Sequence, residues 1–135
     1  MGVCIFVASG LDFDVDRYLK SSPFKTMSVF RKGQIPPQDN PGRQPRPDSG
    51  FATLVTADAQ PDLSKTLPEA IAFLSKREQE LERLNEVGVD NMLLDLGISV
   101  DVPIQQVNYL SPELIMALGR FRMGLILSVI QLPRG

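Results

Sequence analysis

The order of apolar patterns along the chain constrains its fold more than any other feature of the sequence. Short apolar runs typical of strands are separated, for the most part, by segments with helix signals. These runs lie at residues 3–9, 24–33, 51–57, 91–99 and 125–130. The resulting order, β-α-β-β-α-β followed by one more helix and strand, predicts an α+β fold with a ferredoxin-like split β-α-β core (βαββαβ) and an added C-terminal αβ unit. At 135 residues, the chain suits a single domain, 1–135.

Two kinds of strand pattern are present. VCIFVAS at residues 3–9 is continuously apolar, which is typical of a buried strand. NMLLDLGIS at 91–99 alternates instead. The alternation predicts that Met92, Leu94, Leu96 and Ile98 face one way. Leu93, Asp95, Gly97 and Ser99 then face the other way. VPIQQVNY at 102–109 is predicted as a continuing edge strand, because Pro103 has no N–H for a central ladder.

Capping residues predict where the helices begin. Asp14 suits the N-cap of a short first helix, and Phe13 and Tyr18 have the spacing of a hydrophobic staple. Thr66 and Glu69 have capping-box spacing, which predicts a second helix from Thr66 to about residue 87. The third helix is predicted from Ser111 as N-cap and Pro112 at the first helical position, with a buried stripe of Leu114, Ile115, Leu118 and Phe121.

A proline-rich loop insertion, residues 33–49, separates the second and third strands. It holds five of the eleven prolines and, apart from Ile35, no other apolar residue. Loops this long inside a compact domain are usually functional or disordered. Prolines reduce the entropy lost on ordering, and Arg43 and Arg46 offer forked donors to carboxylates or phosphates. We therefore expect a partner, another protein, to contact Arg43 and Arg46.

The composition excludes several chemistries. The chain has no histidine and one cysteine, Cys4, so it lacks Ser-His and Cys-His nucleophile pairs, histidine bases and a histidine or cysteine-rich metal site. No glycine-rich phosphate loop is present. Asp95 remains a candidate for carboxylate chemistry. The preferred interpretation is that it pairs with an arginine such as Arg31 or Arg122, or simply faces solvent. We expect no enzyme activity, no catalytic residue, no metal and no cofactor.

Three alternating aspartates, Asp12, Asp14 and Asp16, follow the first apolar run. Counted as a calcium loop from Asp12, the run has Arg17 in place of the glycine and Pro23 in place of the glutamate, which excludes an EF-hand. Its opening also resembles the D-x-D-x-V motif of haloacid dehalogenase phosphatases, but no later acidic pair follows a strand to hold magnesium. Negative charge at the start of a helix is the preferred interpretation.

Two strand segments resemble RNA recognition motif domains. IFVASGL at residues 5–11 is similar to their first-strand motif, and GFATLV at 50–55 to their third-strand motif. The resemblance implies a single-stranded RNA-binding sheet on which Phe6 and Phe51 stack bases. Thr53 stands where the family has its best stacking aromatic, so two core phenylalanines are the preferred interpretation.

A longer resemblance covers most of residues 5–131. It rests on five blocks, in this order: SGLDFDVDRYLKSSP, VFRKG, AIAFLSKREQELERL, VDNMLLDLGIS and LSPELIMALGRFRMGLILSVI. They resemble a group of bacterial domains of unknown function. The resemblance supports the α+β fold and implies, for some members, an immunity-type or accessory role without assigned catalytic residues.

Charge and cysteine content indicate the class of partner and the cellular compartment. A net charge of −2 and a pI near 5.1 argue against a dedicated nucleic-acid partner. The lone Cys4 cannot form an internal disulfide, which favours the cytoplasm, and no apolar run approaches the about 20 residues of a membrane helix. We expect a cytoplasmic, non-enzymatic protein-interaction domain, with single-stranded RNA binding as the alternative.

Overall fold

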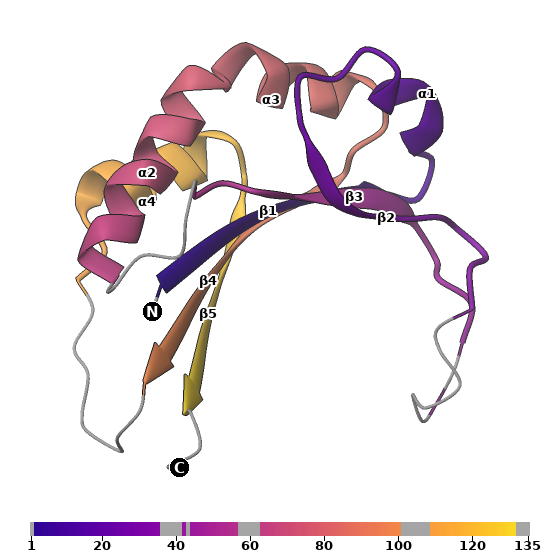
Figure 1. The fold of residues 1–135 in the computed structure, drawn as a ribbon. Coiled ribbons are helices and arrows are strands. Elements are labelled where there is room, and N and C mark those ends of the chain that lie inside the picture. Colours follow the sequence, from indigo (N-terminus) through magenta and orange to yellow (C-terminus); the bar gives the residue numbers. More distant parts are fainter. Residues whose placement is uncertain (1, 36–41, 43, 57–62, 101–108, 132–135) are drawn as a thin grey trace.

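In the part of the chain that the structure describes, five strands form one mixed sheet, and four helices lie on one side of it (Figure 1). The computed structural model describes residues 2–35, 42, 44–56, 63–100 and 109–131. The elements are β1 (Gly2–Gly10), α1 (Val15–Leu19), β2 (Thr26–Phe30), β3 (Ser49–Leu54), α2 (Leu63–Lys76), α3 (Glu78–Glu86), β4 (Asn91–Val100), α4 (Pro112–Arg120) and β5 (Gly124–Gln131). The predicted α+β class is confirmed.

The first strand lies in the middle of the sheet, whose order is β2-β3-β1-β4-β5. β1 pairs antiparallel with β3 and β4, and β2 pairs antiparallel with β3. β5 pairs parallel with β4, which requires a crossover connection; the described part of that connection contains α4. The two edges of the sheet are therefore β2 and β5.

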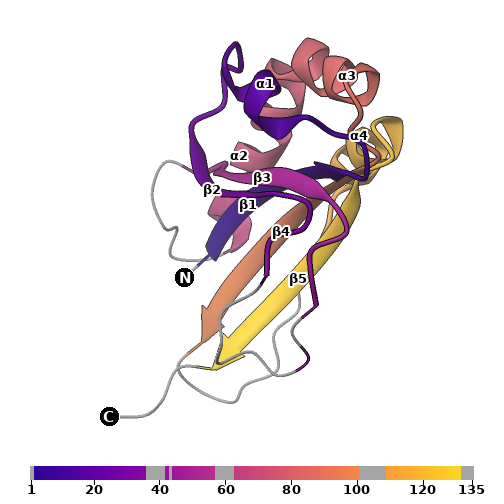
Figure 2. The ribbon, with the colours of Figure 1, turned by 90° about the vertical axis from the view of Figure 1, so that its right-hand side faces the viewer.

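The core lies between the helices and one face of the sheet, as Figures 1 and 2 show from two directions. The buried sheet residues on this face include Cys4, Phe6, Ala8, Phe51, Met92, Leu94, Leu96 and Ile98. Against them the helices bury Ala70, Leu74, Leu81, Leu84, Leu114 and Leu118. Each large apolar side chain buried in this way contributes about 1.5–3 kcal/mol to stability. The predicted alternation of residues 91–99 is confirmed for Met92, Leu94, Leu96 and Ile98, which share one face and are all buried.

An aromatic cluster fills the core beneath α1 and α2. Its rings belong to Phe6, Phe13, Tyr18, Phe24, Phe51 and Phe73. The stacked pair, Tyr18 and Phe51, has centroids 5.6 Å apart. The Tyr18 hydroxyl donates to Glu80 Oε1 at 2.6 Å, which ties α1 to α3. Burial, and then this bond to a carboxylate, raise the pKa of Tyr18.

The predicted starts of the first and last helices are confirmed. Asp14 accepts a hydrogen bond from the Arg17 N–H at 3.1 Å, and Ser111 accepts one from the Leu114 N–H at 3.2 Å. The prediction that Ile115 is buried is wrong, since its side chain is 55% exposed. Successive helical residues are rotated by about 100°, and this step turns Ile115 away from the core that Leu114 faces.

The predicted start of the second helix is wrong. α2 begins at Leu63, so Thr66 lies inside the helix, as does Pro68. The Thr66 side chain is fully buried and therefore packs in the interior rather than capping a helix end in solvent. The predicted single helix is also divided in two, because the backbone of Arg77 leaves helical geometry (φ −104°, ψ 17°) between α2 and α3.

Candidate functional site

The face of the sheet turned away from the helices is predominantly apolar. Strand alternation and pairing place on it Val3, Ile5, Val7, Phe30, Ala52, Leu54, Leu93 and Ile126, together with Ser9, Ser28, Gly50, Asn91, Asp95, Gly97 and Ser128. No described helix covers these residues, which we call the open face (Figures 1 and 2). Near the β5 edge, Ile126 is 45% exposed. In the middle of the sheet, Ile5 and Leu93 are half-buried, because neighbouring side chains on the same face shield one another.

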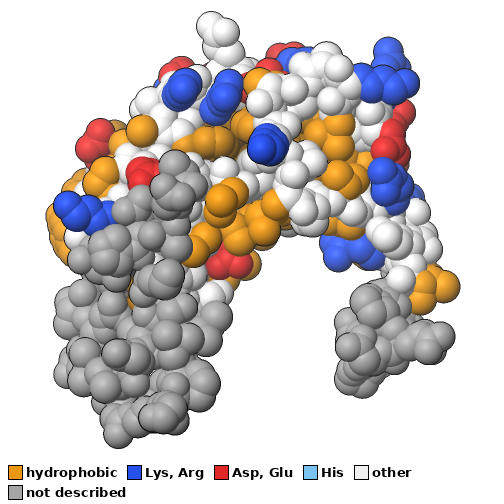
Figure 3. All heavy atoms as spheres, in the orientation of Figure 1, with side chains coloured by type: hydrophobic (Ala, Val, Ile, Leu, Met, Phe, Trp, Pro, Cys, Tyr) orange, Lys and Arg blue, Asp and Glu red, His pale blue; other side chains and the backbone are white. Residues whose placement is uncertain are grey.

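The composition of the open face is unusual for a solvated sheet surface. Antiparallel sheets with one face in water commonly place polar residues on that face. β1 instead carries Val3, Ile5 and Val7 there, so its continuous apolar run supplies hydrophobic side chains to both faces. Contiguous apolar surface that is partly exposed, as it is here, marks interaction sites. Figure 3 looks across the molecule and shows hydrophobic side chains reaching the surface near its middle.

Among the open-face residues, Asp95 alone carries a charge. Ile5 on β1 and Ile126 on β5 are its register partners, and the Ser128 hydroxyl donates to Asp95 Oδ1 at 3.2 Å. The expected pairing with Arg31 is wrong, because Arg31 binds Asp16 instead. Within the described chain no cation pairs with Asp95. A carboxylate set among isoleucines favours a cationic group on any surface that covers it.

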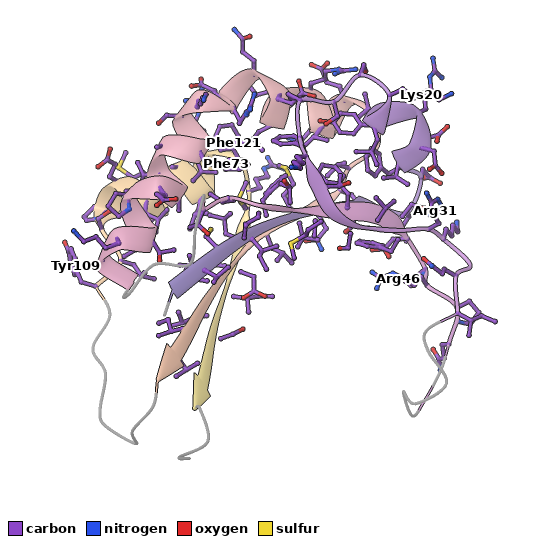
Figure 4. All side chains as sticks on the ribbon, viewed as in Figure 1. Lys20, Arg31, Arg46, Phe73, Tyr109 and Phe121 are labelled. Carbon is purple, nitrogen blue, oxygen red and sulfur yellow. The ribbon has the colours of Figure 1, made fainter. Side chains whose placement is uncertain are left out.

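A stack of three residues forms the β2 end of this face, and we call it the rim stack: Gly50, Phe30 and Arg46. The Phe30 ring lies over Gly50, where a Cβ would come within 2.6 Å of the Phe30 Cζ atom. The Arg46 guanidinium carbon lies 3.9 Å from the centroid of the same ring, a cation–π contact worth about 0.5–1 kcal/mol at an exposed site. Figure 4 shows Arg46 on the underside of the sheet, at the opposite end from Tyr109.

Arg46 also closes the base of the proline-rich loop. The Gly33 N–H donates to the Arg46 carbonyl, and the Arg46 N–H donates to the Gln34 carbonyl, both at 2.9 Å. Its side chain binds Asp48 at 3.1 Å but stays partly exposed. Arg46 therefore has a structural role beside any role in binding. Arg43, the other predicted contact residue, lies outside the described residues.

The structure does not offer Phe6 and Phe51 for base stacking. Both side chains are 0% exposed, and both face the helices. Their ring centroids lie 6.2 Å apart within the aromatic cluster, where no base can reach them. The interpretation of the two residues as core phenylalanines is confirmed, and the predicted RNA-stacking platform is wrong for this arrangement.

The three alternating aspartates do not form one site. Asp14 caps α1, while Asp16 forms an exposed ion pair with Arg31 at 2.8 Å. The hydrogen bond from Arg31 lowers the pKa of Asp16. Asp12 is exposed. Among the residues that the structure describes, no three acidic or cysteine side chains gather closely enough to hold a metal ion.

Comparisons with known proteins supply no relative: no family model, no curated protein and no solved structure matches the chain. In the described ranges no helix is long and apolar enough to cross a membrane. The candidate site therefore rests on geometry. The open face was not predicted from the sequence, although VCIFVAS and Leu93 indicate it by placing apolar side chains on both faces of their strands.

Proposed function

We propose that this chain is a protein-interaction domain and that its open face binds a partner protein. The observation that carries the proposal is the apolar character of that face across β3, β1, β4 and β5. The charges of Asp95 on the open face and of Arg46 in the rim stack indicate the chemistry of the partner. A complementary surface is apolar, places a lysine or arginine opposite Asp95, and places a carboxylate near the exposed edge of Arg46.

The finer fold prediction belongs to the same proposal. The strand order β2-β3-β1-β4 and its antiparallel pairing support a ferredoxin-like core, to which α4 and β5 add a further unit. Such a core has two layers, so one face of its sheet has no packing partner within the core. An apolar side chain on that face gains about 25 cal/mol for each Å² that a partner removes from water.

The expected immunity-type or accessory role fits a domain that acts by covering a surface of another protein. We place this role in the bacterial cytoplasm, and the single, buried thiol of Cys4 supports a reducing compartment. The domain needs no reaction of its own for this role. Single-stranded RNA is the less favoured ligand, because the rings of Phe6 and Phe51 are buried.

The test identifies the partner from the open face itself. p-Benzoylphenylalanine replaces Ile126 on the open face or, as a matched control, Leu11, which is 55% exposed in the turn after β1. After irradiation in cells, mass spectrometry identifies the crosslinked molecule. The recombinant partner is then titrated calorimetrically against the wild type, Ile126→Lys and Leu11→Lys.

We expect position 126, and not position 11, to crosslink one protein other than this chain. Ile126→Lys places a charge in an apolar interface and should weaken binding by about tenfold or more, whereas Leu11→Lys should bind like the wild type. Crosslinking to RNA or to a second copy of this chain, equal affinities of the two lysine variants, or no crosslink from position 126 would each contradict the proposal.

A further inference from the structure

We infer that a second site, on the helical side of the sheet, binds a small anionic molecule with an apolar body. The site is a groove between α2 and the β2–β3 pair, which we call the strand–helix groove. Its volume is about 740 Å³, within the range of about 300–1,000 Å³ that is typical of small-molecule sites. It does not depend on the function proposed for the open face.

The groove exists because α1 is too short to cover both strands beneath it. α1 has five residues, and at 1.5 Å per residue it spans only about 7 Å. β2 alone has five residues in extended conformation, which span about 17 Å. The helical layer therefore leaves a groove beside α2, which is lined by Thr26 and Met27 at the beginning of β2 and by Leu54 at the end of β3.

Positive charge borders the groove. Lys25 precedes β2, while Lys76 and Arg77 lie at the junction of α2 and α3, and all three line the groove. In the described chain none of the three forms an ion pair, and the Arg77 guanidinium lies over the Phe24 ring at 5.8 Å. Glu69 also lines the groove, but its interactions with neighbouring residues already engage it. The excess positive charge favours an anionic ligand.

The interior of the groove supplies an apolar contact and an unused polar group. Phe24 and Phe73 are half-buried, with ring centroids 5.9 Å apart, and both line the groove. The Thr56 Oγ1 atom is buried and has no hydrogen-bond partner among the residues that the structure describes. A buried hydroxyl without a partner destabilises the folded chain, and a ligand oxygen or N–H beside it would offset part of that cost.

These features specify the chemical class of the ligand. The two phenylalanines match an aromatic or other apolar body, and the three cations match a carboxylate or phosphate head. Inorganic phosphate alone lacks the body, and a neutral aromatic alcohol lacks the charge. Neither fragment should bind as well as a molecule that combines both.

The experiment uses 1-naphthyl phosphate as the probe, with 1-naphthol and inorganic phosphate as its two fragments. Binding to the full chain is followed by protein-observed NMR at low and physiological salt. One variant, Lys25→Gln with Lys76→Gln, removes two groove cations. Its matched control, Lys20→Gln with Lys32→Gln, removes two exposed lysines outside the groove. A third variant, Ala72→Phe, fills the groove from the exposed side of α2 without changing its charge.

We expect naphthyl phosphate to bind more tightly than either fragment and more weakly as salt is raised. The groove double variant and Ala72→Phe should each weaken binding by about tenfold or more, while the control double variant and Ile126→Lys bind like the wild type. Equal binding of naphthol and naphthyl phosphate, no effect of the groove variants, or no binding of naphthyl phosphate would overturn the inference. The unchanged affinity expected of Ile126→Lys separates this outcome from a failure of the open-face proposal.

Discussion

Of the three alternating aspartates, Asp14 has a defined structural role, which is to cap the N-terminus of α1. Its carboxylate accepts the Arg17 N–H at the start of α1, and loss of an N-cap costs about 1 kcal/mol. We therefore expect Asp14→Ala to lower the free energy of unfolding by about that amount in urea denaturation. Asp12→Ala is the matched control, because it removes the same charge from an exposed position and should stay within about 0.5 kcal/mol of the wild type. Equal losses in the two variants would refute the capping role.

The burial of Cys4 should make the stability of the folded chain depend on pH. Burial, with smaller contributions from Asp95 and Glu69, raises the pKa of Cys4 from 9.0 to about 12. Above pH 9 the unfolded thiol loses its proton while the folded thiol keeps it, so ionisation of Cys4 favours the unfolded chain as pH rises. Below pH 9 both forms are protonated, and this contribution to stability is fully present.

From pH 8 to pH 10 the wild type should therefore lose about 1 kcal/mol more stability than Cys4→Ala. The measurement is the free energy of urea unfolding of both proteins at the two pH values. Cys4→Ala serves as its own reference at pH 8, because the small cavity it leaves affects both measurements alike. Parallel losses in the two proteins would show that the thiol ionises as readily in the folded chain as in the unfolded one.

At the scale of elements, features set by neighbouring residues could be predicted from the sequence, whereas features set by tertiary packing could not. The caps at Asp14 and Ser111 act within one turn, so residues three positions apart sufficed to predict them. The start of α2 was mispredicted because Thr66 has the right chemistry for a cap but lies in the interior. The exposure of Ile115 likewise depends on which side of α4 faces the core, and the local pattern of apolar residues does not determine that side.

Pro68 distinguishes the observed start of α2 from the predicted one. In a helix that begins at Leu63, Pro68 lacks an N–H where the helix needs a donor and its ring crowds the preceding turn. Pro68→Ala should then raise the free energy of unfolding by about 1 kcal/mol or more, even after the added freedom of the unfolded chain is subtracted. In a helix capped by Thr66, Pro68 would be a favourable first-turn residue, and the same change would lower stability. Thermal and urea unfolding give the sign.

At the scale of the molecule, the strand patterns also indicate which faces of the sheet are apolar, and the fold prediction did not use that information. The continuous run at residues 3–9 was correctly predicted to form a strand, but the expected burial is complete on only one of its faces. A run that is apolar on both faces predicts burial on both faces, yet the described helices cover only one (Figure 1). The sequence could not reveal this mismatch, because the number of layers depends on how all the elements pack. The mismatch is the physical basis of the proposed interaction surface.

Hydroxyl-radical footprinting of Ile126, read by mass spectrometry with Leu11 as internal control, tests that surface most directly. Both side chains are exposed in the structure, so both should be oxidised in the free chain. Addition of the crosslinked partner should protect Ile126 and leave Leu11 as reactive as before. An Ile126 that is unreactive in the free chain, or equally reactive with and without the partner, would contradict the account.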